Sequence, residues 1–411
     1  MITIDGVTET LTRLSRFFIR CYQSGQQSRD LDPQDAAAFG QYLDQLPSHH
    51  RGMHGTSAAL RVLASVDGSE GRTAARRVVR YLTDRAAIEE VAPPPQGKED
   101  RIRKVREDEQ NVIKVSEVLY ALSHVPRSVA ETGSLVSDLA ARLRAGMTQN
   151  RAWTYFLNES QAPPQLLPTA YAVRGLAAHR YDVGEPVQYL VRELQSPMGR
   201  PRQTDISVRV LCVFVLAFLP SLPAGVEEGK LRGWLARLWN QLEPLLGQDL
   251  EANIEYSNGD SNYYVRVPWQ LYLISAASRL KPFRCFASAL AQRRLSSIVK
   301  AVGSEEGFFY PHSGDRVSSR TNGILYDVLW LIRDEIRSKA IFLIPFQIID
   351  NVRVFFGSRR MKVSLTVLVL AIIVASIWSW TRAASASIAD LGPGFAGALM
   401  LLILSARKEA P

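Results

Sequence analysis

Seven charged residues lie within apolar stretches of this sequence and are its best candidates for binding a ligand. They are Arg61, Lys114, Arg174, Arg209, Arg266, Arg320 and Asp327. A buried guanidinium without a partner costs on the order of several kcal/mol, so such groups gather only around water, acids or an anionic ligand. Arginine also matches phosphate and carboxylate oxygens with a planar pair of donors. We therefore expect a positively charged site for an anionic small molecule or peptide.

A plainer interpretation is that each base pairs with an acid or points to solvent. Few acids are available in the same stretches: Glu117, Asp205 and Asp327. Asp327 stands among Leu325, Val328 and Leu329, so we expect it to be paired or to face a cavity.

Asp205 has two further interpretations. It stands four residues before Arg209, the spacing of an ion pair at the start of a helix. Asp205 and Asp327 together would also suit the two-carboxylate chemistry of glycosidases.

Metal and cofactor chemistry have weaker support. His50 and His54 have the spacing of two metal ligands on a helix. Gly52 and Gly55 argue against a helix there, so we expect the histidines to pack in a loop and predict no metal site. The three cysteines, at positions 21, 212 and 285, fit no metal pattern or disulfide framework. No cofactor can be assigned.

The charged residues lie in or beside six apolar segments, each predicted to be a buried helix. A more amphipathic helix is predicted after each, and successive starts are separated by roughly 40 to 60 residues, the spacing of helix-pair repeats. The segments begin near Gly55, Lys114, Pro168, Thr204, Tyr263 and Thr321. The alternation indicates an inner and an outer layer of helices.

Two of the repeats are preceded by an aromatic loop. Trp153, Tyr155 and Phe156 come before the helix-forming run that Pro168 and Thr169 open, with Thr169 as a helix cap. The residues 307–310, sequence GFFY, come before the last segment. These loops and helices resemble the repeat of the squalene cyclase and prenyltransferase β-subunit superfamily over Arg51 to Arg337. The resemblance implies an all-α fold, an α/α toroid of about six helix pairs.

The resemblance also implies an enzymatic alternative, a membrane-associated enzyme that processes terpenoid, prenyl or glycan substrates. The acidic D-x-D-D motif of the squalene cyclases does not occur in this sequence. Asp205, Cys212 and His312 do not reproduce the order of the zinc ligands of the prenyltransferases. Catalysis is therefore an open question, and the first alternative is a non-enzymatic binding module, which could be the sensing part of a membrane effector.

The C-terminal part has a different composition. Val363 to Thr381 contains about 19 uncharged residues, close to the ~20 that span a bilayer, and Leu391 to Ala406 is a shorter apolar run. We expect a transmembrane hairpin over 363–411, preceded by an amphipathic membrane-proximal segment at 338–362, the toroid at 51–337 and a helical cap at 1–50. The alternative is a buried hairpin of a soluble domain.

Charge sets the expected location and partners. Basic residues flank both apolar runs, which by the positive-inside tendency places the toroid in the cytoplasm. The formal net charge is +9. We expect a lipid bilayer and an anionic small molecule or peptide as partners, and we do not expect nucleic acid.

Overall fold

The computed structural model describes most of the first 355 residues. The described ranges are 4–27, 37–40, 43, 53–87, 111–195, 203–222, 226–247, 252–257, 262–267, 269–280, 285, 288–302 and 317–355; the side chains of 4, 85–87, 203–205, 252–257, 262–267 and 339–355 lie outside the description. The chain divides into two compact units, Met1–Ala340 and Ile341–Pro411. The account below concerns the first unit and helix α14, which begins in it and continues past Ala340.

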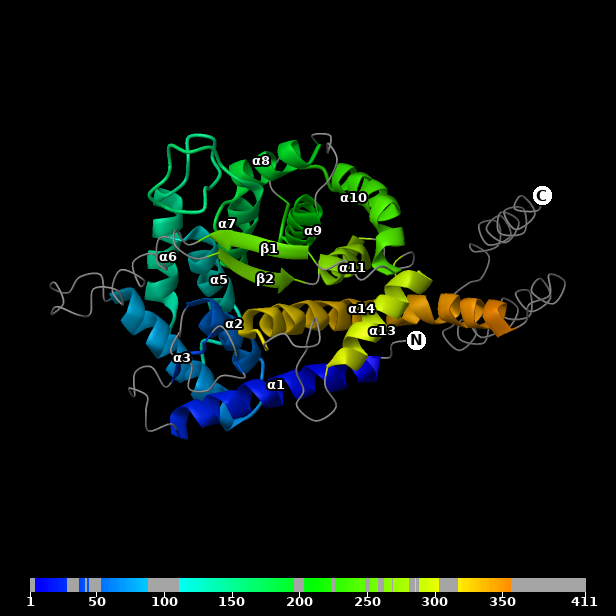
Figure 1. Cartoon of the computed structure of the whole chain (residues 1–411), viewed down its shortest axis with the longest axis horizontal. Coiled ribbons are helices and arrows are strands. Elements are labelled where there is room, and N and C mark those ends of the chain that lie inside the picture. The colour runs from blue at the N-terminus through cyan, green and yellow to red at the C-terminus, as the bar shows by residue number, and fades with distance from the viewer. Residues whose placement is uncertain are drawn as a thin grey trace, which may run out of the picture. The chain divides into compact units, whose positions relative to one another are not determined.

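The first unit is built from helices, which confirms the predicted all-α class (Figure 1). The helices are α1 Ile4–Gln27, α2 Met53–Ala64, α3 Ser69–Ala87, α5 Val112–Leu122, α6 Gly133–Ala145, α7 Leu166–Ala178, α8 Gly184–Gln195, α9 Gln203–Ala217, α10 Glu228–Leu242, α11 Trp269–Leu280, α13 Ala289–Ala301 and α14 Ser319–Phe355, with a short 3₁₀ turn η3 at Glu243–Gly247. One antiparallel hairpin joins β1 Ala252–Ser257 to β2 Asn262–Val267.

The predicted alternation of apolar and amphipathic helices has a direct counterpart in the packing. Helices α2, α5, α7 and α11 bury almost every residue, whereas α3, α6, α8, α10 and α13 bury one side. Each mostly buried helix packs on the next, in the order α2, α5, α7, α9 and α11, and α3, α6 and α8 pack outside α2, α5 and α7 (Figure 1). The outer helices keep one polar side in solvent, whereas the inner helices are surrounded by other helices. Both sequence patterns therefore follow from how much of each helix contacts water.

Two glycines let inner helices approach closely. A Cβ on Gly323 of α14 would lie 2.7 Å from the Cβ of Ala58 on α2. A Cβ on Gly175 of α7 would lie 2.8 Å from the carbonyl oxygen of Ser116 on α5. Real Cβ atoms are not found so close to other heavy atoms, so any larger residue would separate the helices. The last inner helix is thereby placed beside the first.

The aromatic loop before α7 anchors that helix. Trp153 is fully buried, and its Nε1–H donates to the carbonyl oxygen of Leu143 at the end of α6 over 2.7 Å. Its backbone N–H donates to the Thr169 hydroxyl over 3.0 Å. Thr169 was expected to cap the helix, but α7 begins earlier, at Leu166, and the hydroxyl ties the loop to α7 instead.

One predicted helix start is wrong. The segment from Tyr263 was predicted to be helical, yet residues 262–267 form β2 and the helix begins at Trp269. The sequence NYYVRV is rich in aromatic and β-branched residues and follows a polar turn sequence, a combination that favours a hairpin. Pro345 does not end α14, which continues to Phe355.

The N-terminal segment, where a helical cap is expected, contains the amphipathic helix α1. Leu11, Leu14, Phe18 and Cys21 are buried, and α1 packs against α2, α3 and α13.

No helix within the described residues is long and apolar enough to cross a bilayer. The predicted membrane spans at 363–381 and 391–406 lie outside the described residues, as does the second aromatic loop, at 307–310.

Candidate ligand-binding site

A group of buried charges lies where α2, α5, α7 and α14 meet. We call it the central charged cluster; its members are Arg61, Lys114, Glu117, Tyr120, Arg174, Arg320 and Asp327. Every charged member is at most 9% exposed to solvent. Ionised side chains are rarely buried so deeply unless they are paired, so the partner of each one matters.

Helical periodicity directs these side chains to one place. Glu117 and Tyr120 are three residues apart on α5, and Tyr171 and Arg174 are three apart on α7. Residues at this spacing share one face of a helix. Helices α5 and α7 therefore each contribute a charged residue and a tyrosine on the same face.

Asp327 is the first of two acidic centres in the cluster. Its Oδ2 accepts from Nη2 of Arg174 and from Nη1 of Arg61, the latter at 3.4 Å. Its Oδ1 accepts from the Tyr120 hydroxyl at 3.3 Å, and Nε2 of His124 lies 3.7 Å away. Burial alone would raise the pKa of Asp327, but Arg174 and Arg61 outweigh burial and hold that pKa below its ordinary value. Asp327 is thus buried, ionised and paired, as its apolar neighbours predicted.

Arg174 is held in place by aromatic rings as well as by Asp327. Its guanidinium carbon lies 3.8 Å from the ring centroid of Tyr120 and 5.1 Å from that of Phe214 on α9. Burial would lower the pKa of Arg174, but Tyr120 and Asp327 raise it above its ordinary value. This arginine is a fixed, permanent charge.

Glu117 is the second acidic centre. Its Oε1 accepts from Nε of Arg320 at 3.0 Å, and its Oε2 accepts from Nδ1 of His54. Nη2 of Arg320 also donates to the Tyr171 hydroxyl over 3.1 Å. Burial would raise the pKa of Glu117, but Arg320 and His54 lower it to about 2. Burial lowers the pKa of His54 to about 4, so at neutral pH a neutral histidine donates to an ionised glutamate.

Two groups in or beside the cluster keep hydrogen-bonding capacity. Arg61 is 2% exposed, and its Nε and Nη2 have no hydrogen-bond partner among the described residues. The buried hydroxyl of Tyr272 on α11 likewise has none within the described part of the chain. Arg61, Arg174 and Arg320 all lie close enough to lower the pKa of Tyr272, although burial dominates and raises it well above its ordinary value.

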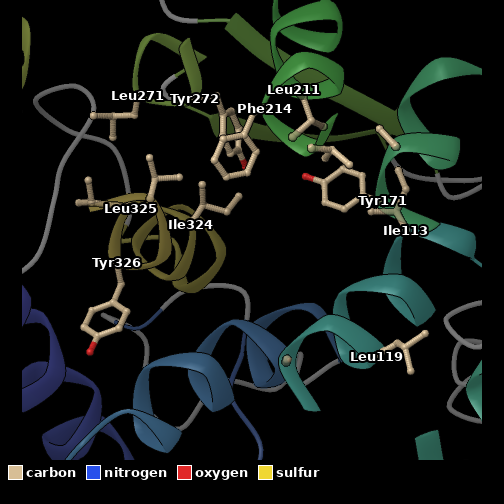
Figure 2. Packing of buried hydrophobic residues seen from close by; sticks show 14 of the residues in the cluster. Ile113, Leu119, Tyr171, Leu211, Phe214, Leu271, Tyr272, Ile324, Leu325 and Tyr326 are labelled. Carbon is tan, nitrogen blue, oxygen red and sulfur yellow. The ribbon is translucent and has the colours of Figure 1, made fainter. Parts of the chain in front are cut away.

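The aromatic side of the cluster is visible in Figure 2. Tyr171 points from α7 toward the side where Phe214 and Tyr272 lie, and Ile324 of α14 completes that side. The rings of Phe214 and Tyr272 are 4.8 Å apart. Polar donors are thus set in an otherwise apolar interior, an arrangement typical of sites that bind and orient small ligands.

Four of the seven residues singled out in the sequence are joined by described contacts. Arg61 and Arg174 share Asp327, and Arg320 joins the cluster through Glu117. Lys114 is buried at the Glu117 end, where its charge contributes to lowering the pKa of His54.

The other two predicted bases lie elsewhere. Arg209 is half-buried and directs Nη1 to the carbonyl oxygen of Leu194 on α8, at 3.1 Å. Arg266 lies on β2 opposite Asn253 and not on an inner helix, and its side chain is outside the description. The side chain of Asp205, considered as a glycosidase acid, is also outside it.

Sequence reasoning missed several members of the site. His54 was assigned to a loop, but it lies in the first turn of α2, and the glycine beside it meets the backbone of Gly40. Tyr120, Tyr171 and His124 were not considered. For the two tyrosines a signal existed, because each stands three residues from a charged residue within an apolar helix.

The chain matches no protein-family model and no curated protein.

Proposed function

We propose that residues 51–337 form a closed α/α toroid whose interior binds an anionic small ligand or peptide at the central charged cluster. The packing order from α2 to α11 and the contact of Gly323 with Ala58 support closure of the ring. The sharing of one carboxylate, that of Asp327, by Arg61 and Arg174 supports the class of ligand.

Arg61 is the observation on which the proposal depends. It shares the carboxylate of Asp327 with Arg174, and its distance to that carboxylate is 3.4 Å, long for a charge-assisted hydrogen bond. Two of its nitrogens lack a hydrogen-bond partner in the described residues although the side chain is buried. An unsatisfied buried donor costs roughly 1–3 kcal/mol. A ligand oxygen that accepts from Nε and Nη2 would remove that cost.

The enzymatic alternative has weaker support. A general acid needs a carboxyl that remains protonated near neutral pH, which requires a raised pKa. The pKa values of Asp327 and Glu117 are both lowered, because arginines contact each of them. The two acids at the centre of the site are therefore suited to holding cations in place and not to donating protons.

For the chain as a whole we propose a cytoplasmic toroid held at a membrane by the C-terminal apolar runs. The support is in the sequence: Val363 to Thr381 carries no charge, and basic residues precede it. This arrangement would suit the sensing part of a membrane effector.

The test of anion binding is the substitution Arg61→Met. Because methionine fills a similar volume without charge, the unliganded variant should be as stable as the wild type or more so. Calorimetric titration with inorganic phosphate should show that the variant binds phosphate about tenfold to a hundredfold more weakly than the wild type. This factor corresponds to the loss of roughly 1.5–3 kcal/mol. Arg209→Met is the matched control and should bind phosphate like the wild type. Equal phosphate affinity in wild type and Arg61→Met, or a marked loss of stability in that variant, would contradict the proposal.

A further inference from the structure

The outer face of α3 carries four arginines at the spacing of one helix side. We call Arg72, Arg76, Arg77 and Arg80 the α3 arginine face; all four are exposed. Positions 72, 76 and 80 follow one another at intervals of four residues, which places them in a row about 12 Å long. The sequence between Glu70 and Asp84 contains no acid. These guanidinium groups therefore form a concentrated patch of positive charge.

Among the described residues no acid pairs with the α3 arginine face, whereas several bases on other helices have an acid partner. Arg13 pairs with Glu9 on α1, Arg142 with Asp138 on α6, and Arg232 with Glu228 on α10, each at a spacing of four residues. By contrast, the described hydrogen bonds of the α3 arginine face end on neutral oxygens. Arg72 donates to the Gly68 carbonyl, Arg76 to the Val129 carbonyl and Arg77 to the Gln26 amide oxygen.

The same hydrogen bonds describe the shape of this surface. Arg76 reaches the loop before α6 on one side of α3, with Nε 2.9 Å from the Val129 oxygen. Arg77 reaches α1 on the other side, with Nη1 2.6 Å from Gln26. The inward side of α3, including Ala75, Val78 and Leu82, is buried. Neighbouring elements thus flank the helix on both sides, unlike a helix that stands free to enter a groove.

We propose that the α3 arginine face docks the protein on the anionic headgroups of a lipid bilayer. A flush, charged surface fits a flat polyanion, and arginines near an anionic leaflet each contribute about a fivefold gain in partitioning. Reading DNA bases requires an element that enters a groove. Binding single strands uses exposed aromatic rings, and the exposed positions of α3 between Arg72 and Asp84 are arginine, threonine and aspartate. The uncharged run from Val363, which we expect to enter the bilayer, would bring such a surface into reach.

The first experiment measures vesicle binding by the full-length protein. Lipid titrations compare neutral phosphatidylcholine vesicles with vesicles containing 30% phosphatidylglycerol. We call the ratio of the two affinities the anionic increment. Because apolar segments can insert into both kinds of vesicle, this increment isolates the effect of charge. Neutralising all four arginines to glutamine should reduce that increment by roughly several hundredfold. The control removes the same charge from bases that pair with acids: Arg13→Gln, Arg142→Gln, Arg192→Gln and Arg232→Gln. It should keep most of the increment.

A second readout locates the contact directly. The native cysteines are all buried, so an environment-sensitive dye can be attached at Thr73→Cys on α3 or at Gln241→Cys on α10. These helices lie at opposite edges of the unit (Figure 1). Brominated anionic lipids should quench the dye at position 73 and not at position 241, and 0.5 M salt should remove the quenching by screening, since the Debye length falls to a few ångströms near 1 M.

Three results would overturn the proposal. The first is equal quenching of the dye at positions 73 and 241. The second is an equal loss of the anionic increment in the α3 variant and in the control variant. The third is salt-sensitive binding to duplex DNA or RNA that depends on the α3 arginine face, while vesicle binding does not depend on it. None of these results bears on phosphate binding at Arg61, which is measured without lipid.

Discussion

The two acidic centres of the cluster both pair a carboxylate with arginine, but they differ in how many hydrogen-bond donors surround each acceptor. Asp327 receives two arginines, a tyrosine and a nearby histidine. Glu117 receives Arg320 and His54, and Arg320 donates onward to Tyr171. The Asp327 centre is therefore oversupplied with donors, while the Glu117 centre spreads its donors over two acceptors. Unused hydrogen-bonding capacity collects beside Asp327, and we infer that a ligand would bind at that end.

The largest effect that separates the two centres is expected from Asp327→Asn. The substitution leaves Arg61 and Arg174 buried without a counter-charge, and removing one partner of a buried pair costs about 3–5 kcal/mol. Urea denaturation at pH 7 should show the free energy of unfolding lowered by that amount. Asp138→Asn, which breaks an exposed pair with Arg142, is the control and should cost under about 1 kcal/mol. Similar losses in the two variants would mean that Asp327 does not neutralise buried charge.

Glu117→Gln should have a smaller effect. Glutamine keeps an oxygen that can accept from Arg320 or His54, and only one arginine loses its directly contacting acid. Loss of a hydrogen bond to a charged group is worth about 1.5–3 kcal/mol. The same denaturation measurement tests the order, and a loss that exceeds that of Asp327→Asn would contradict the comparison.

The smallest effect is the pH dependence that His54 contributes. The folded-state pKa of His54 is about 4 and its ordinary value is 6.5, so between these values the unfolded chain binds more protons. The stabilising contribution is complete above pH 6.5 and is lost as the pH falls toward 4, with a slope of at most about 1.4 kcal/mol per pH unit. In His54→Gln, unfolding free energies measured at pH 7 and pH 5 should differ less than in the wild type. An unchanged difference would show that His54 is not the group that titrates.

Much of the fold was predictable, because each helix has its own hydrophobic pattern in the sequence. The apolar helices carry their periodicity in the sequence, and the burial of Asp327 followed from its leucine and valine neighbours. The strand at 262–267 was not predicted, since a short run of aromatic and β-branched residues beside a turn fits a hairpin as well as a helix start. The inclusion of Met53 and His54 in α2 was missed because glycine was taken as a helix breaker, while here Gly55 permits contact with Gly40.

The site was less predictable than the fold. Spacing along one helix shows that Tyr120 and Glu117 share a face, but it does not show which other helix that face meets. Arg61 and Asp327 are 266 residues apart in sequence, and they meet because Gly323 allows α14 to lie against α2. Such a contact depends on how all the intervening helices pack, which a single sequence does not display. For that reason Arg209 was grouped with the cluster although its described hydrogen bond goes to α8, and Arg266 although it lies on a strand.

The contact between the first and the last inner helix also constrains the order of folding during synthesis. Arg61 and Arg174 are made long before Asp327, so a nascent chain that ends before α14 carries two arginines without the carboxylate that neutralises them. Contacts of such high sequence separation form late and slow the folding of a domain. The inner helices before α14 should accordingly stay loosely assembled on the ribosome, and they should become resistant to protease only after the segment containing residue 327 has emerged.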